Sequence, residues 1–337
     1  MKKWLPFLIV ALVLSVIILF WRQQRAHHQT DRVYADTASV MMTTEPITPI
    51  PMTVVLDQRK VALGQQLFND AQLSRDNTIS CASCHSLSKG GTDRLVHPVG
   101  IGAQIGIINA PTVFNSGFNF KQFWDGRSAT LEEQVDVPTH DPAEMASNWP
   151  QILEKLGKSP GYVKDFGALY SDGLQSANVR DAIATFERSL ITPNSRFDQY
   201  LRGDSTALSA EETEGYRVFK EYGCASCHQG INIGGNLFEK FGVMGDYFAK
   251  RGNITKSDLG RFNLTNLAAD RYVFKVPSLR NVALTGPYFH DGTAKRLEDA
   301  VTIMSIYQLG HPLTTSETKS LVEFLKSLSG EYQGKAL

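Results

Sequence analysis

Apolar residues recur every three or four positions in several stretches of this chain, which is the period of an amphipathic α-helix. The pattern predicts helices over residues 57–70, 178–191 and 314–330. The last stretch has Thr314 and Glu317 at the spacing of a capping box and Gly330 as a stop signal. The residues predicted to face the core are Val61, Leu63, Leu67, Phe68, Val179, Ile183, Phe186, Leu190, Leu321, Phe324, Leu325 and Leu328. Strand-like alternation is scarce, so we expect an all-α soluble part with long loops.

The first residues follow a different pattern, because an uncharged apolar run extends from Trp4 to Trp21 behind two lysines. Such a run is near the shortest length that spans a bilayer. It predicts a transmembrane anchor or a cleaved signal peptide over residues 1–25, and the missing small-residue cleavage pattern favours the anchor. Residues 26–54 contain Pro46, Pro49 and Pro51 and are typical of a linker.

An internal repeat organises the rest of the chain. The stretch "SCASCHSL" begins at Ser80 and "GCASCHQG" begins at Gly223, and a helical stretch with aromatic residues precedes each. We therefore predict two domains of the same kind in tandem, at residues 55–200 and 201–337.

The composition is that of an ordinary globular protein and does not indicate a particular function. Apolar residues make up 42% of the chain and charged residues 20%, which is ordinary for a globular protein and too apolar for disorder. The 34 basic and 34 acidic residues balance, so nothing indicates a nucleic-acid partner.

The cysteines carry the strongest chemical signal. All four lie in the two repeats, and a histidine directly follows each pair: Cys81, Cys84 and His85 in one copy, Cys224, Cys227 and His228 in the other. Two thiols at this spacing can each add to a haem vinyl group, and the adjacent imidazole then binds the iron as proximal ligand. A four-cysteine zinc site or two disulfides would give no reason for the repeated histidine, and a thioredoxin-like pair needs a βαβ context. The spacing predicts two covalently bound c-type haems. Together with the N-terminal segment, it favours the periplasmic side of a bacterial inner membrane.

The second axial ligand decides what each haem does, because two strong ligands favour electron transfer and an open position favours binding of peroxide or oxygen. For the C-terminal haem, Met304 is the candidate sixth ligand, and Met244 is its rival. A methionine can also simply fill space in a core, so spacing alone leaves these alternatives open.

From about Leu63 to Gly330 the chain resembles the bacterial di-haem cytochrome c peroxidases, a family that includes the related methylamine-utilisation enzymes. The stretches that carry the resemblance are "GGTD", "NAPTVFN", "QFWDGRSATLEEQ", "PAEM", "VFKVPSLRNVALTGPYFHDG" and "LEDAV", in the family's order and spacing. They cover most of the predicted soluble part and are more specific than the cysteine motifs alone.

The resemblance implies roles for particular residues. Met304 falls at the axial methionine of a high-potential C-terminal haem, where methylamine-type relatives have a tyrosine, and Trp124 falls between the two haems. Glu144 matches the acid-base glutamate on the peroxide side of the N-terminal haem, and Gln134 matches its polar companion. The resemblance further implies an interdomain calcium ion with oxygen ligands from Asn109, Thr285 and Pro287.

The expected function is reduction of hydrogen peroxide to water, with electrons from a small donor such as a cytochrome c or a copper protein. The alternatives are a methylamine-type enzyme that oxidises a protein partner and a membrane-tethered electron-transfer cytochrome. A homodimer is common in the family and is a further expectation.

One loop departs from the family pattern. Many members have a histidine in the loop after the first haem motif that closes the N-terminal iron until the second haem is reduced. An ungapped count places Ile101 there, and isoleucine cannot bind iron; the only histidine in the loop is His97, four residues earlier. We expect the N-terminal haem to be open or closed only by water, unless His97 replaces the missing ligand.

Overall fold

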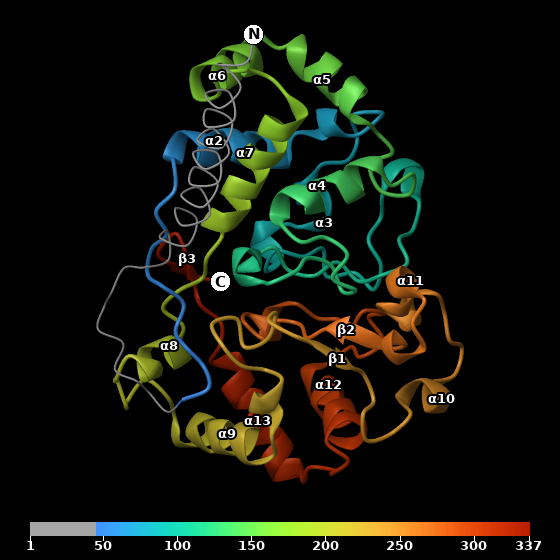
Figure 1. Cartoon of the computed structure of the whole chain (residues 1–337). Coiled ribbons are helices and arrows are strands. Elements are labelled where there is room, and N and C mark those ends of the chain that lie inside the picture. Colours follow the sequence, from blue (N-terminus) through green and yellow to red (C-terminus); the bar gives the residue numbers. More distant parts are fainter. Residues whose placement is uncertain (1–44) are drawn as a thin grey trace, which may run out of the picture. The chain divides into compact units, whose positions relative to one another are not determined.

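The computed structural model describes residues 45–337, which are mostly helical (Figure 1). The predicted anchor and most of the predicted linker, residues 1–44, lie outside the described residues. Among the described residues, none of the helices has both the length and the apolar character needed to cross a membrane. The α-helices are α2 Gln58–Asn69, α3 Cys81–Cys84, α4 Leu131–His140, α5 Trp149–Gly157, α6 Pro160–Leu169, α7 Ser176–Ser189, α8 Arg196–Leu201, α9 Ala210–Glu221, α10 Tyr247–Arg251, α11 Phe262–Thr265, α12 Leu297–Ile303 and α13 Thr315–Lys326.

The three helices predicted from periodicity are present as α2, α7 and α13. The carboxylate of Asp57 caps α2, and Thr314 and Glu317 form the predicted capping box of α13. The predicted core residues are buried, apart from Val61, which is half-buried. These helices were predictable because each presents one apolar stripe to a core, and α2 and α13 also carry a start signal in the sequence.

The all-α class is correct for the main elements, but the described residues also contain two small antiparallel ribbons. One pairs β1 (Phe238–Lys240) with β2 (Val273–Lys275), and the other pairs β3 (Glu331–Tyr332) with β4 (Lys335–Ala336). Strands of two or three residues are too short to show an alternating pattern, which is why the sequence did not indicate them.

The repeat is visible as two helix pairs, α2 with α7 and α9 with α13 (Figure 1). In each pair the first helix precedes a cysteine motif in the chain, and the second helix packs against the first helix. Gly64 in α2 and Gly215 in α9 permit this close packing, since a Cβ on either would lie about 2 Å from a carbonyl oxygen of the partner helix.

The two halves share buried polar contacts. The side-chain amides of Asn115 and Asn281 both donate to the hydroxyl of Thr192, at 2.7 and 3.0 Å. Both asparagines adopt a left-handed backbone conformation, with φ near +60°, at equivalent places in "TVFN" and "SLRN". The C-terminal ribbon returns to the first half, where Tyr332 packs edge-on against Phe114.

Residues 45–51, assigned from the sequence to the linker, pack on the C-terminal half. Ile47 and Ile50 are 0% exposed, and Ile47 belongs to the core formed by α9 and α13. The backbone of this segment is bonded as well: Ile50 N–H donates to Asp198, and Arg280 donates to the carbonyl of Thr48 at 3.0 Å. We call residues 45–51 the N-terminal strap.

Candidate active site

The first cysteine motif forms one short helical turn. Cys81 and Cys84 are the ends of α3, and both thiols are free. The backbone N–H of His85 closes the turn by donating to the Cys81 carbonyl at 2.9 Å. The imidazole Nδ1 faces the Gly91 carbonyl at 3.4 Å, which leaves Nε2 as the ring atom available to an iron. Burial lowers the pKa of His85, so the ring is neutral, as a metal ligand must be.

The second motif repeats this arrangement. Cys224 and Cys227 are free thiols on a tight turn that begins at Gly223, which has φ +84°. His228 N–H donates to the Cys224 carbonyl at 2.9 Å, and its Nδ1 faces the Ile233 carbonyl at 3.2 Å. Burial lowers the pKa of His228 to about 4. Both motifs therefore fit a covalently attached haem with a neutral histidine ligand.

A cavity that is partly open to solvent lies over the first motif, with about 620 Å³ of empty space when the open solvent at its mouth is included. Its walls come from the cysteine motif, from the loop around residues 98–106, from α4, from the "PAEM" loop and from α7. Gln134 and Glu144, predicted to act on peroxide, both line it, as do Cys81, Cys84 and His85. The structure thus brings together the residues that the family resemblance assigned to the N-terminal haem.

The carboxyl group of Glu144 is suited to holding a proton. It makes no hydrogen bond to the described residues, and burial together with nearby Asp141 raises its pKa, against a smaller opposing effect of Arg127. A carboxylate whose pKa is raised in this way accepts a proton more readily than an ordinary glutamate does.

The loop after the first motif presents backbone rather than a ligand to the cavity. Pro98, Gly100 and Gly106 line it, whereas neither Ile101 nor His97 does. Ile101 is 1% exposed, and its N–H donates to the Glu144 carbonyl at 2.8 Å. A Cβ at Gly100 would lie 2.0 Å from the Ala143 carbonyl oxygen, so the loop is packed tightly on the "PAEM" loop.

The two candidate methionines differ in their surroundings. Met304 is half-buried and begins a single π-helical turn, Met304–Gln308, directly after α12. Such turns occur frequently at functional sites. Met244 is 63% exposed in a loop, with its backbone N–H bonded to the Tyr307 carbonyl. These positions favour Met304 over Met244 as an axial ligand.

Trp124 is fixed where the two halves meet. Its indole Nε1–H donates to the Asn109 carbonyl at 2.9 Å, and Asn109 N–H donates to the His290 carbonyl at 2.8 Å. The His290 ring lies edge-on to Trp124, with 6.3 Å between ring centroids. These contacts join a loop of the first half to the "YFHDG" turn of the second.

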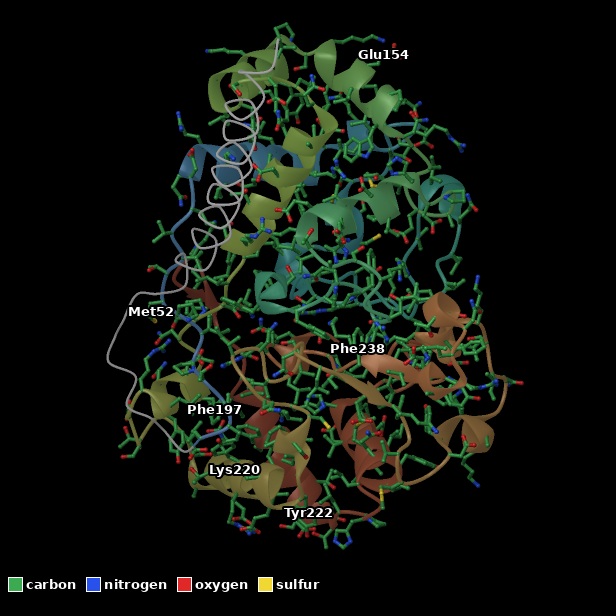
Figure 2. All side chains as sticks on the ribbon, in the orientation of Figure 1. Met52, Glu154, Phe197, Lys220, Tyr222 and Phe238 are labelled. Carbon is green, nitrogen blue, oxygen red and sulfur yellow. The ribbon has the colours of Figure 1, made fainter. Side chains whose placement is uncertain are left out.

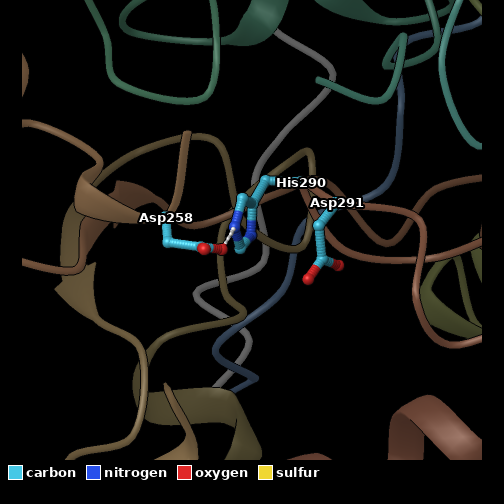
Figure 3. Close-up of side chains that lie close together, drawn as sticks. All are labelled: Asp258, His290 and Asp291. Carbon is cyan, nitrogen blue, oxygen red and sulfur yellow. Dashed lines mark hydrogen bonds and ion pairs between the residues drawn. The ribbon is translucent and has the colours of Figure 1, made fainter. Parts of the chain in front are cut away.

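Two residues of the "YFHDG" turn, His290 and Asp291, form a cluster of ionisable groups with Asp258, which lies in the turn at residues 257–259 (Figure 3). This cluster has the composition of a metal site. His290 Nε2 is 2.7 Å from an Asp258 oxygen, and the Arg251 guanidinium is bonded to both carboxylates. Although burial opposes ionisation, the hydrogen bonds from His290 and Arg251 lower the pKa of Asp258. Because Arg251 pairs with both carboxylates and His290 is bonded to Asp258 as well, we interpret the cluster as a structural ion network rather than a cation site.

The predicted calcium ligands lie on segments that touch. Asn109 is bonded to the His290 backbone, and Thr285 and Pro287 lie just before it in the same turn. Within residues 45–337, no hydrogen bond is accepted by the Asn109 side-chain oxygen or by the Thr285 and Pro287 carbonyls. Unused oxygens of this kind fit a hard cation.

Sequence reasoning missed two buried ionisable residues near these sites. Glu187, on α7, lines the cavity at 5% exposure and has one carboxyl oxygen without a partner. Lys275, on β2, is 8% exposed. Hydropathy patterns treat both as surface residues, and only the folded structure reveals their burial.

Known proteins resemble this chain over almost its whole length. The sequence model of the family described as "Di-haem cytochrome c peroxidase" matches residues 58–206. The cytochrome c peroxidase Ccp of Escherichia coli is 48% identical over 94% of this chain and 67% of its own length. The cytochrome c551 peroxidase of Nitrosomonas europaea is 45% identical over 88% of this chain and 87% of its own length. The chain belongs to the di-haem cytochrome c peroxidase family.

The fold agrees with this assignment. A crystal structure of a MauG-like protein associated with microbial copper homeostasis matches 88% of this chain and 95% of its own, with a TM-score of 0.74 and 26% identity. The enzyme class predicted from the sequence, cytochrome c peroxidase, is confirmed by the relatives. Membership in a di-haem family also supports the two predicted c-type haems.

Proposed function

We propose that the protein reduces hydrogen peroxide to water on the periplasmic side of the inner membrane, with electrons from a small cytochrome c or copper protein. His228 and Met304 would hold the haem that receives these electrons, and His85 would hold the haem at which peroxide reacts. When bound, the haems supply the iron that carries electrons and binds peroxide. The observation that carries the proposal is the cavity in which Glu144 and Gln134 lie beside the first cysteine motif.

Glu144 is the proton-transfer residue in this proposal. Its carboxylate would accept the proton of one peroxide oxygen and return it to the other, so that this oxygen can leave as water when the O–O bond breaks. The two electrons for the second water would come from the donor through the haems, and its two protons would come from solvent. The raised pKa of Glu144 favours uptake of the proton, and the amide of Gln134, which lines the same cavity, orients the peroxide. The cavity lining includes apolar Ile79, Val135 and Ile183, which limit competing water.

Trp124 is suited to a role between the haems. Its indole is held by Asn109 and by the His290 ring at the junction of the two halves. Calcium bound by Asn109, Thr285 and Pro287 would fix the same junction, because Asn109 also carries the acceptor for the Trp124 indole. Membrane anchoring through residues 1–25 and formation of a homodimer belong to the proposal as well.

Replacement of Glu144 tests the proton-transfer step. We expect Glu144→Gln to lower the rate of peroxide reduction about 10²- to 10⁴-fold, because the amide keeps the shape but cannot shuttle a proton. Turnover is measured with a reduced small cytochrome as donor, and absorption spectra verify that both haems are attached. The matched control is Glu154→Gln, which changes an exposed glutamate of the same half. Absence of peroxide turnover in the unmodified protein would contradict the proposed function itself.

The loop after the first cysteine motif leads to a second expectation, that the N-terminal iron has no second protein ligand in the fully oxidised enzyme. Ile101 is buried away from the cavity, and His97 does not line it. Electron paramagnetic resonance of the oxidised and half-reduced forms should then show a high-spin N-terminal haem in both, unchanged in His97→Ala. A low-spin bis-histidine signal that disappears in His97→Ala would refute this expectation.

A further inference from the structure

Lys275 is a buried cation at the junction of the two halves. It is the last residue of β2 and pairs with Phe238 of β1, the residue labelled where the orange ribbon faces the green half (Figure 2). Its N–H donates to the Trp124 carbonyl at 2.7 Å, and the Phe238 ring contacts Phe120 of the first half. Only 8% of the residue is exposed.

No anion accompanies this charge. Within residues 45–337, the Lys275 ammonium forms no ion pair and no hydrogen bond with a side chain, and burial alone lowers its pKa to about 8. Burying an unpaired ammonium is costly, and buried lysines are normally paired or hydrogen-bonded.

Other buried or partly buried cations among the described residues follow that rule. Arg280 is fully buried and pairs with the equally buried Asp198 at 2.7 Å. Arg251 pairs with two carboxylates. Lys155 is partly buried and donates to the Ser74 and Arg75 carbonyls, at 2.6 and 2.9 Å. Among these cations of residues 45–337, Lys275 is the exception, which indicates that its anion comes from outside this part of the chain.

The surroundings point to the haems as the source of this anion. Along the chain, Lys275 lies two residues before Pro277, whose carbonyl contacts the His228 ring. Through its backbone it is bonded to Trp124, which is tied to Asn109 on the side of the N-terminal haem. Each c-type haem carries propionate carboxylates in addition to the vinyl groups used by the cysteines, and a carboxylate is the partner that a buried ammonium requires.

We propose that Lys275 binds a haem propionate at the junction of the two halves and thereby positions that haem beside Trp124. The inference rests on the proposed presence of both haems but on no step of peroxide chemistry. A fixed positive charge on a propionate favours the reduced iron, so Lys275 also raises the midpoint potential of the haem that it binds.

The test is spectroelectrochemical titration of the holoprotein, without peroxide or donor. We expect Lys275→Met to shift the reduction equilibrium of one haem about tenfold toward the oxidised form, which is about 59 mV lower for a one-electron couple. Lys275→Arg keeps the positive charge, so both haems of this variant should have midpoint potentials close to those of the unmodified protein. Lys240→Met, which removes an exposed lysine from the paired strand, should change neither potential.

The spectra identify which haem supplies the carboxylate. A shift of the low-spin histidine–methionine haem assigns the propionate to the C-terminal haem, and a shift of the other assigns it to the N-terminal haem. If Lys275→Met cannot be obtained with both haems attached, Lys275→Gln replaces it in the titration, because glutamine also lacks the positive charge but is polar. If the midpoint potentials of both haems in Lys275→Met equal those in Lys240→Met, the pairing of Lys275 with a propionate is refuted. Because no turnover is involved, this failure is distinct from failure of the peroxidase assay.

Discussion

At the scale of single residues, Glu187 shows how burial changes the behaviour of an acid. Glu187 lines the cavity over the first cysteine motif, and burial raises its pKa to about 8, with a smaller opposing effect of the adjacent Arg188. The ordinary value is 4.5, so between about pH 4.5 and pH 8 the folded protein keeps a proton that the unfolded chain releases. The unfolded state then binds fewer protons, and the free energy of unfolding falls as the pH rises through this range.

Glu187→Gln should remove this dependence. We expect the variant to gain stability relative to the unmodified protein as the pH rises from about 5 to about 8, by at most about 1.4 kcal/mol per pH unit. The measurement is urea unfolding of the holoprotein at several pH values in that range. Glu133→Gln, an exposed glutamate of α4, is the comparison variant. A stability difference that stays constant with pH would show that Glu187 is ionised in the folded state.

At the scale of elements, the two helix pairs depend on glycine in equivalent places. A Cβ at Gly64 would lie 1.9 Å from the Ala182 carbonyl oxygen, and one at Gly215 would lie 2.0 Å from that of Ser320. Both obstacles are backbone atoms inside a partner helix, so the helices must separate to admit a methyl group. The cysteine motif that follows each first helix would then move with it.

Alanine at either glycine should therefore destabilise the protein. We expect Gly64→Ala and Gly215→Ala each to lower the free energy of unfolding by about 1–3 kcal/mol or more, the usual cost of overpacking a core. Gly167→Ala on α6 is the matched control, because a Cβ added there would have no other atom within 4 Å; it should be neutral or slightly stabilising. Urea unfolding followed by circular dichroism measures all three, and equal stability of Gly64→Ala and Gly167→Ala would contradict the packing argument.

Elements were predictable from sequence where a local pattern specifies them. Periodic apolar residues predicted α2, α7 and α13, and the cysteine spacing predicted the two haem motifs. Each of these signals consists of residues that are close together in the sequence. Glu144 and Trp124 became candidates only through family resemblance, since their environments depend on segments distant in sequence. Lys275 and Glu187 gave no signal at all, because a charged side chain buried by tertiary contacts breaks no local pattern.

At the scale of the whole molecule, the N-terminal strap is another feature that local sequence patterns did not predict. Residues 45–51 were assigned to a linker because Pro46, Pro49 and Pro51 interrupt any periodic pattern. The structure places Ile47 in the core with α9 and α13, while the strap carbonyl of Thr48 accepts a hydrogen bond from buried Arg280. The strap thus contributes to the core of the half that carries the second haem motif.

Removing one side chain of the strap should weaken this core. We expect Ile47→Ala to lower the free energy of unfolding by about 2–5 kcal/mol, because truncating a fully buried isoleucine forfeits its transfer energy and leaves a cavity. Met52→Ala, at a 54% exposed position just beyond the strap, should change stability by less than about 0.5 kcal/mol. Urea unfolding of both holoproteins, followed by circular dichroism and haem absorbance, makes the comparison. If residues 45–51 act as a free linker instead, the two variants will unfold at the same urea concentration.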